Sequence, residues 1–239
     1  MKIARLSVLI LLAGTVSLSS CKKKGCTDEA AVNYNASAKK DDGTCNFKPV
    51  ITIVGSNPVN VSVGATYTDA GATAFVKNEG AVDVTTDLSQ VNTAAAGEFT
   101  VTYTASNTHG TTTATRLVKV VLGQSTYMGN YTLENTCNAV DFPHVAAPQI
   151  VAGANSDQVL INDAFTAIGG TIVMNINGAD VTVPGTSIPI EVLGQTVGTL
   201  DFSGTGTMNA AGTQIVMNYD WTRTGLIEGN GVCTITYNK

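Results

Sequence analysis

The stretch Gly97–Ala105, GEFTVTYTA, decides the fold of the middle of the chain because its side chains alternate strictly. One face is apolar and carries Phe99, Val101, Tyr103 and Ala105. A period of two with β-branched and aromatic residues is typical of a half-buried strand. A turn at 107–110 and a second run at 111–121 follow. The pattern predicts an antiparallel hairpin.

Short alternating segments flank this hairpin, for example VITIV at 50–54 and VNVSV at 59–63. Residues 49–122 therefore predict seven short strands that form a small sandwich. The region has neither a tryptophan nor a cysteine, so its core is expected to rest on aliphatic side chains and four aromatic ones. Those four are Tyr67, Phe75, Phe99 and Tyr103. Tyr103 either fills the core or bonds across a loop as a tyrosine corner.

Three segments in this region carry a family resemblance. They are PVIT at 49–52, VSVGATYTDAGA at 61–72 and GEFTVTYTA at 97–105. Their order resembles the bacterial surface immunoglobulin-like (Ig-like) domains related to hyalin repeats. The resemblance implies an Ig-like sandwich that acts as a spacer or adhesive unit, and the fold alone implies no chemistry.

The N-terminus has the features of an export signal. Lys2 and Arg5 precede an apolar run at 6–16 that is too short to span a bilayer, and LSSC ends at Cys21. The tetrapeptide resembles the lipobox of bacterial lipoproteins, which implies that residues 1–20 are removed and that Cys21 carries acyl chains such as palmitate. Lys22 stands where an aspartate retains enterobacterial lipoproteins in the inner membrane, so the resemblance favours the outer membrane and leaves its face open. The alternative is an ordinary secretory leader followed by an unrelated cysteine.

The charge balance argues against nucleic acid as a partner. Removing residues 1–20 takes away Lys2 and Arg5, which leaves 11 basic residues against 18 acidic ones and a net charge of −7. An acidic protein without a basic face repels the phosphate backbone. Only 13% of the residues are charged, and 24 are glycines, which suits exposed sheets with tight turns.

Cysteine arithmetic predicts two disulfides. Lipidation of Cys21 leaves four of the five cysteines. Pairing by neighbourhood gives Cys26–Cys45 and Cys137–Cys233. Zinc is the rival interpretation, but the chain has no CxxC and only two histidines.

Residues 21–48 predict a lipidated tether followed by a disulfide-closed motif. CTD at 26–28, AVNY at 31–34 and DDGTC at 41–45 resemble a motif of secreted proteins from Bacteroidetes-type bacteria. Asp28, Asp41 and Asp42, with nearby asparagines, offer oxygen ligands for calcium. The spacing is not that of a helical calcium loop, so turn capping by the same side chains is the favoured interpretation and calcium the alternative.

Residues 123–239 predict eight or nine strands in simple succession, hence an antiparallel meander or barrel-like β domain. Asn177-Gly178 indicates a type I′ hairpin, and strands are expected at 127–136, 180–183 and 188–193 among others. YMGNY at 127–131 and CTITY at 233–237 resemble the lipocalin-like domains that end many Bacteroidetes-type lipoproteins. A bond between Cys137 and Cys233 would close such a sheet.

One strand of this domain carries the candidate binding residues. Ile215, Met217, Tyr219 and Trp221 share a face at 214–221. The face either lines a barrel that holds an apolar ligand or a sugar, or it is ordinary core, which is the favoured interpretation.

No catalytic motif is present in the sequence, so we expect no enzyme. The expected function is a lipid-anchored binding or adhesion module of the cell outer membrane, with the Ig-like domain as spacer. The alternatives are a small-ligand or glycan carrier that uses the C-terminal barrel, and an envelope-assembly protein that binds a partner protein. The membrane, through Cys21, is the expected partner in each case.

Overall fold

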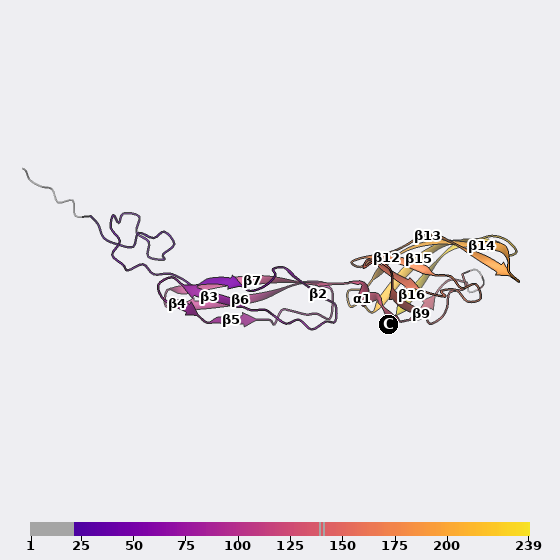
Figure 1. Cartoon of the computed structure of the whole chain (residues 1–239), viewed down its shortest axis with the longest axis horizontal. Coiled ribbons are helices and arrows are strands. Elements are labelled where there is room, and N and C mark those ends of the chain that lie inside the picture. The colour runs from indigo at the N-terminus through magenta and orange to yellow at the C-terminus, as the bar shows by residue number, and fades with distance from the viewer. Residues whose placement is uncertain (1–21, 139, 141) are drawn as a thin grey trace, which may run out of the picture.

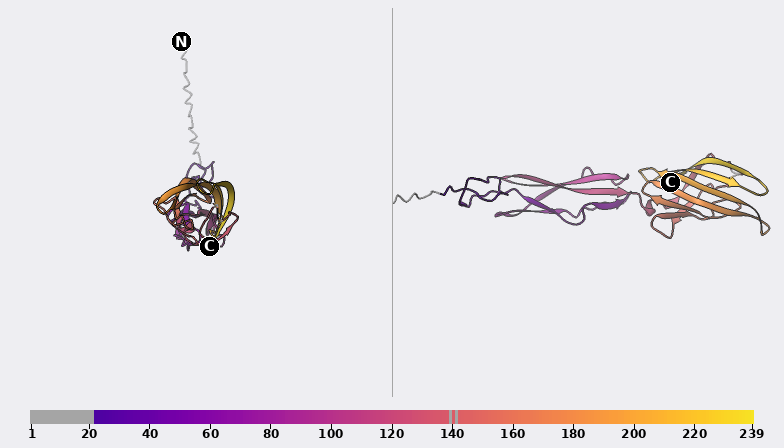
Figure 2. Two further views of the ribbon diagram at one scale, coloured as in Figure 1. Left: turned by 90° about the vertical axis from the view of Figure 1, so that its right-hand side faces the viewer. Right: turned by 90° about the horizontal axis from the view of Figure 1, so that it is seen from above.

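The computed structural model describes residues 22–138, 140 and 142–239, and it is almost entirely β. A tether, a sandwich and a barrel-like domain follow one another along one axis (Figure 1 and Figure 2). The described residues form sixteen strands and one short helix, α1 (Gln124–Tyr127). None of their helices has the length and apolar character needed to cross a bilayer.

The middle domain is a sandwich of two sheets, as the alternating pattern predicts. One sheet contains, in order, β1 (Val50–Ile53), β3 (Ala72–Val76) and β4 (Gly80–Val82). The other contains β2 (Val59–Ser62), β7 (Gly110–Val121), β6 (Gly97–Asn107) and β5 (Val84–Asp87). The predicted hairpin is β6–β7, in which Asn107 pairs with Gly110.

The sandwich core differs from the expectation at Phe75. Val101, Tyr103, Val118 and Val120 are buried between the sheets, and Tyr67 and Phe99 pack at their border. Phe75 is 58% exposed, because its neighbours Ala74 and Val76 take the inward positions of β3. It lies opposite Val50 on the outer face. The prediction that Phe75 belongs to the core was therefore wrong.

A buried charge cluster fixes the loop between β2 and β3 to strands β6 and β7. Arg116 of β7 and Asp69 form an ion pair at 2.8 Å, with side chains only 2% and 7% exposed. The hydroxyls of Tyr67 and Tyr103 donate to the same carboxylate oxygen at 2.7 and 2.8 Å. The other oxygen accepts the Gly71 amide. Tyr103 thus both fills the core and bonds across a loop.

This environment changes the acidity of Asp69. Burial alone would raise its pKa, but the hydrogen bonds from Tyr67, Tyr103 and Gly71 and the charge of Arg116 outweigh burial and lower it. The carboxylate is therefore held in its charged form, which a buried partner of Arg116 requires.

The C-terminal domain is one nine-stranded antiparallel sheet in which chain neighbours pair in succession. Its strands are β8 (Gly129–Asn130), β9 (Thr132–Asn135), β10 (Gln149–Ala152), β11 (Gln158–Ile161), β12 (Ile172–Asn177), β13 (Asp180–Val192), β14 (Gln195–Met208), β15 (Gln214–Arg223) and β16 (Gly229–Asn238). The sheet begins with β8 and ends with β9, and only Tyr131 separates these two in the chain. The bent segment 129–135 therefore pairs with strands at both edges of the sheet, and β8 and β9 together take the place of one strand. The sheet is thus a nearly closed barrel, and the predicted meander is confirmed.

Three local predictions in this domain were wrong. The runs at 180–183 and 188–193 form the single strand β13, which continues through a bulge near Pro184 and Gly185. The β12–β13 turn is centred on Gly178 and Ala179, of which only Gly178 has positive φ, so it is not the predicted type I′ turn. The segment at 127–136 does not start as a strand, because Tyr127 ends α1 and is buried.

Both disulfides have the predicted pairing. Cys26 and Cys45 are joined across 19 residues, and Cys137 and Cys233 across 96 residues. The second bond connects the segment after β9 to β16, its neighbour in the sheet. It therefore secures the closing edge of the barrel.

The sandwich and the barrel contact each other directly. The amide of Ala96 donates to the carbonyl of Ala210 at 2.8 Å, and Val63 and Ala96 pack against the barrel core beside Leu122. Gly212 has a φ of +70°, and a Cβ there would lie 3.6 Å from Val63 of the sandwich. The turn between β14 and β15 thus faces the sandwich, which places the hairpin between β13 and β14 at the opposite end of the barrel.

Candidate functional site

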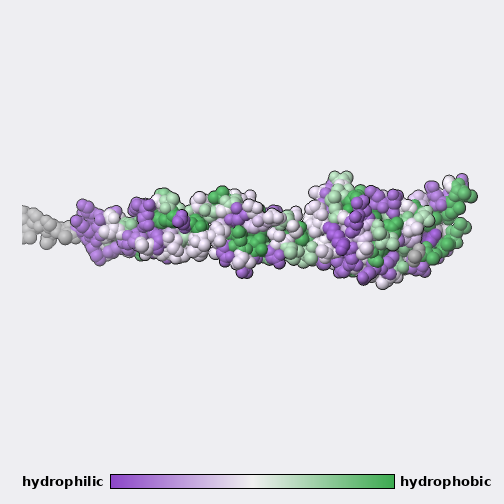
Figure 3. Space-filling view, turned by 90° about the horizontal axis from the view of Figure 1, so that it is seen from below, coloured by the Kyte–Doolittle hydropathy of each residue, from purple (hydrophilic) through white to green (hydrophobic). Residues whose placement is uncertain are grey.

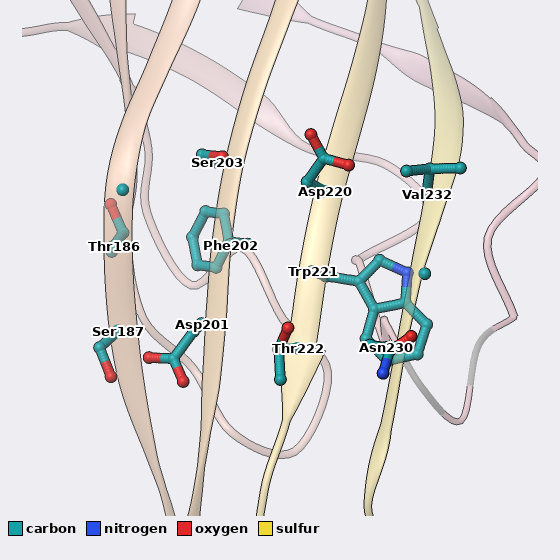
Figure 4. Close-up of a pocket in the computed structure, with 12 residues that line it drawn as sticks. Thr186, Ser187, Asp201, Phe202, Ser203, Asp220, Trp221, Thr222, Asn230 and Val232 are labelled. Carbon is teal, nitrogen blue, oxygen red and sulfur yellow. The ribbon is translucent and has the colours of Figure 1, made fainter.

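The outer wall of the barrel carries an open polar groove of about 770 Å³ across β13–β16. Figure 4 shows three rows of residues there. The outward rows contain Ser187, Asp201, Thr222 and Asn230 on one side and Ser203, Asp220 and Val232 on the other. Between them lies the row of Thr186, Phe202, Trp221 and Gly231, whose register places its side chains toward the interior.

The chemistry of this groove is that of hydroxyl, amide and carboxylate groups. Asp201 accepts a hydrogen bond from Thr199 at 3.0 Å, and Asp220 is exposed. No histidine, lysine or arginine is among the lining residues. Among the described residues there is also no group of three side chains that could hold a metal ion. The groove can hydrogen-bond a polar molecule.

The predicted binding stripe divides into two parts. Ile215, Met217 and Tyr219 are buried in the barrel core. Trp221 is half-buried and lies over Gly231, where a Cβ would be 3.2 Å from the indole ring. Its main chain helps to form the floor of the groove while its ring faces the other side of the sheet. Ligand binding by Met217, Tyr219 and Trp221 stays a prediction.

Aromatic side chains from two loops fill the barrel interior. Phe142 has its ring 5.1 Å from that of Phe165 and 5.2 Å from that of Tyr219. Phe165 in turn lies 5.2 Å from Phe202. All four are buried. This packing favours a solid core over a ligand cavity.

A polar chain runs through the same interior. His144 Nδ1 lies 3.0 Å from the carbonyl of Val145, which can only accept, so Nδ1 carries the proton. His144 Nε2 therefore accepts from the hydroxyl of Tyr237 at 3.0 Å, and Tyr219 donates to Tyr237 at 2.9 Å. Burial lowers the pKa of His144 to about 4, against the hydrogen bond to Val145, which raises it. Burial also raises the pKa of both tyrosines, so the network is neutral.

The far end of the barrel carries an exposed apolar cluster, which we call the tip. It consists of Val192 and Leu193 in the β13–β14 hairpin and Leu226 and Ile227 in the β15–β16 loop. Figure 3 shows apolar surface gathered at this end, opposite the tether. A pocket of about 160 Å³ lies between the two loops, lined among others by Ile190. Sequence analysis missed the tip, although a leucine before Gly194 in a two-residue turn is itself an unusual signal.

The predicted calcium residues each cap a local turn. Asp28 bonds the amide of Ala30 and forms an ion pair with Lys77. Asp41 accepts the amide of Gly43, and Asp42 accepts both the amide and the hydroxyl of Thr44. These contacts are those of the turn-capping interpretation, and calcium binding stays a prediction. Cys21, the predicted lipidation site, lies outside the described residues.

Charge is distributed unevenly along the molecule. Residues 22–48 contain six basic and four acidic residues, which gives +2, and residues 49–122 contain three and five, which gives −2. Residues 123–239 contain only Arg223 and Lys239 against nine acidic residues, which gives −7. Nearly all of the excess negative charge is therefore on the barrel.

These features define an all-β protein in which an Ig-like sandwich carries a barrel-like domain. Residues 51–120 match the family model for the Ig-like domain of bacterial surface proteins, in agreement with the sandwich that this segment forms. A search of curated proteins finds no match. Among solved structures, a lipoprotein from Bacteroides thetaiotaomicron is similar to this protein. The alignment covers 80% of this chain and 100% of the lipoprotein chain, with 14% sequence identity and a TM-score of 0.28.

Proposed function

We propose that this protein is a non-catalytic, lipid-anchored component of the bacterial outer membrane whose Ig-like domain holds a β-barrel binding module away from the lipid surface. The observation that carries the proposal is the linear order of tether, Ig-like domain and barrel (Figure 2). The Ig-like domain is of a class found on bacterial surfaces. The LSSC sequence at Cys21 supplies the anchor.

The junction between the domains supports a spacer role. The Ala96–Ala210 hydrogen bond and the packing of Val63 against the barrel core join the two domains end to end. A spacer that bends freely would let the barrel approach the membrane. The contacts at this junction oppose such bending.

The charge distribution favours the same orientation. Lys22, Lys23 and Lys24 adjoin the anchor, where each contributes about 1 kcal/mol of attraction to an anionic lipid surface. Such attraction decays over about 8–10 Å, so it acts on the tether alone. The barrel, with a net charge of −7, gains nothing by approaching that surface.

The barrel favours binding at its surface over carriage in its interior. Phe142, His144 and Phe165 occupy the described interior, whereas the tip and the groove are open. An envelope protein is the partner that an apolar tip suits best. The polar groove favours a glycan as a second candidate, because its hydroxyl, amide and carboxylate groups match those of sugars.

Membrane fractionation tests the anchor. In Cys21→Ala the protein is expected to move from the membrane pellet to the soluble fraction. As a matched control, replacing Lys22, Lys23 and Lys24 with glutamine should leave it in the pellet. Retention of Cys21→Ala after high-salt washing would contradict the lipid anchor. Protease treatment of intact cells then reports which face of the membrane carries the barrel.

A further inference from the structure

We propose that the tip is a docking surface for a protein that presents one apolar side chain surrounded by lysine or arginine. The inference deepens the proposed function, since it names the binding surface of the module, but it does not require the lipid anchor. It rests on exposure, backbone conformation, pocket size and charge.

The exposure of the tip has no structural benefit. Leu193 is 99% exposed and Leu226 is 81% exposed, and Val192 and Ile227 lie beside them. Val192, Leu226 and Ile227 line one pocket, and Leu193 follows Val192 in the hairpin, so the four aliphatic side chains form an apolar patch at the end of the barrel. Patches of this kind mark interaction sites, whereas single exposed apolar residues are ordinary.

Leu193 also has an unfavourable backbone conformation. Val192 pairs with Gln195, so Leu193 and Gly194 are the two central residues of the turn, and both have positive φ, +53° and +77°. Asparagine or glycine is preferred at the first of these positions, and a leucine there is strained. Strain at a side chain that makes no contact in its own domain points to a function for that side chain.

The second loop is held firmly beside the hairpin. The amide of Thr224 donates to the carbonyl of Thr199 at 2.9 Å, and their hydroxyls are 3.0 Å apart. Gly225 has a φ of +100° and touches β14 so closely that a Cβ would be 1.9 Å from the carbonyl oxygen of Val197. Leu226 and Ile227 therefore stay next to Val192 and Val197, with which they line the pocket, so the pocket between the loops is preformed.

The pocket has room for one apolar side chain. Its volume is about 160 Å³, and a cavity of roughly 150 Å³ accepts a benzene ring. The lining is aliphatic apart from Thr224 and Arg223. A leucine or phenylalanine of a partner is an anchor of suitable size, as at the centre of many protein interfaces.

Charge selects the partner among the candidates. Glu191 and Glu228 are exposed and adjoin the apolar residues, while Arg223 donates a hydrogen bond to the carbonyl of Val140. A second copy would bring together two barrels with a net charge of −7 each, and an anionic bilayer would also be repelled. A partner with a basic rim is complementary to this tip.

The test uses the soluble protein from Lys22 onward and a labelled synthetic peptide with leucine and phenylalanine at its centre and lysines on both sides. Fluorescence anisotropy is expected to show saturable binding that weakens with salt. A peptide with glutamates in place of the lysines and one with serines in place of the apolar residues are expected not to bind.

Leu193→Asn is the decisive variant, because asparagine suits the turn and should leave the barrel as stable as before. It is expected to weaken peptide binding by about tenfold, as is Leu226→Ser. Val50→Ser is the matched control, since Val50 is 67% exposed but lies in β1 of the Ig-like domain. Glu191→Lys with Glu228→Lys should weaken binding further, whereas Asp157→Lys, in the turn before β11, should not.

Three results would overturn the proposal. They are equal binding by Leu193→Asn and the unaltered protein, dimerisation in sedimentation that Leu193→Asn abolishes, and binding to anionic lipid vesicles in preference to the peptide. Because the anchor is absent from this experiment, its outcome is separate from that of Cys21→Ala. If the peptide did not bind the tip but fractionation showed that Cys21 anchors the protein in the membrane, the proposed anchor and spacer would still stand.

Discussion

The two domains stabilise their β-sheets by different means. The Ig-like domain contains no disulfide and buries an ion pair, Asp69–Arg116, with two tyrosine hydroxyls on the carboxylate. The barrel is closed by a disulfide and buries a neutral chain from His144 through Tyr237. A charged cluster and a neutral one respond differently to mutation and to pH. The comparison therefore predicts two separate sets of sensitivities in one molecule.

The only tryptophan makes these sensitivities measurable one by one. Trp221 lies in β15 of the barrel, so its fluorescence reports unfolding of that domain. Circular dichroism reports both domains. The difference between the two signals follows the Ig-like domain.

The largest effect is expected from the barrel disulfide. Replacing Cys137 and Cys233 together with serine removes a cross-link over 96 residues, which the chain-entropy account values at about 4.7 kcal/mol. The free energy of unfolding obtained from the tryptophan transition should fall by that amount, and the midpoint of the transition should move to a lower denaturant concentration. Replacing Cys26 and Cys45, which lie in the tether and outside the barrel, should leave the tryptophan transition unchanged. An equal effect of both pairs would show that the domains do not unfold independently.

The next effect is expected in the Ig-like domain. Asp69→Ala leaves the charge of Arg116 buried without a partner, which costs about 3–5 kcal/mol. The loss should appear in circular dichroism and not in the tryptophan signal. Asp87→Ala is the matched control, because that carboxylate is exposed and bonds only the neighbouring Ser89. A small effect of Asp69→Ala would contradict the view that the ion pair organises this domain.

Acid should weaken the barrel before the Ig-like domain. Unfolded His144 binds a proton below about pH 6.5, but the folded barrel binds it only near pH 4. The unfolded state thus holds more protons between these values, so barrel stability is full above about pH 6.5 and falls by about 3 kcal/mol toward pH 4. The pKa of Asp69 is lowered, so its contribution is full above about pH 4 and is lost only in stronger acid.

Denaturant unfolding at pH 7 and pH 5 distinguishes these responses. At pH 5 the tryptophan transition should occur at a lower denaturant concentration than at pH 7, and the transition of the Ig-like domain should not move. In His144→Gln, where the amide can still accept from Tyr237, the dependence of the barrel between pH 4 and pH 6.5 should disappear. If the pH dependence of barrel stability persisted in His144→Gln, it would arise from titratable groups other than His144.

The sequence predicted most of the fold because strict alternation has one structural interpretation. The seven-strand sandwich, the meander and both disulfides follow from patterns at a spacing of two and from the cysteine count. The position of Phe75 did not follow, because alternation fixes which residues share a face and not which face is buried. The long β13 was predicted as two strands because Pro184-Gly185 resembles a turn, whereas the structure accommodates it as a bulge.

The surfaces were harder to predict than the strands. The groove depends on the register of four strands, from Ser187 to Asn230, which no local pattern encodes. His144 follows a loop proline, and its burial depends on packing against Tyr237. Leu193 had a local signal, the leucine before Gly194, but only the turn geometry shows that it is strained.

The smallest effects are expected from removing one hydroxyl in each cluster, and they test the comparison most directly. Tyr219→Phe removes a neutral hydrogen bond while Tyr237 keeps its bond to His144, so it should cost about 1 kcal/mol. Tyr67→Phe removes a hydrogen bond to a charged carboxylate, which is worth about 1.5–3 kcal/mol. Each loss should appear only in its own domain's transition. If Tyr219→Phe proved the more costly variant, the neutral chain of the barrel and not the ion pair would be the stronger of the two polar clusters.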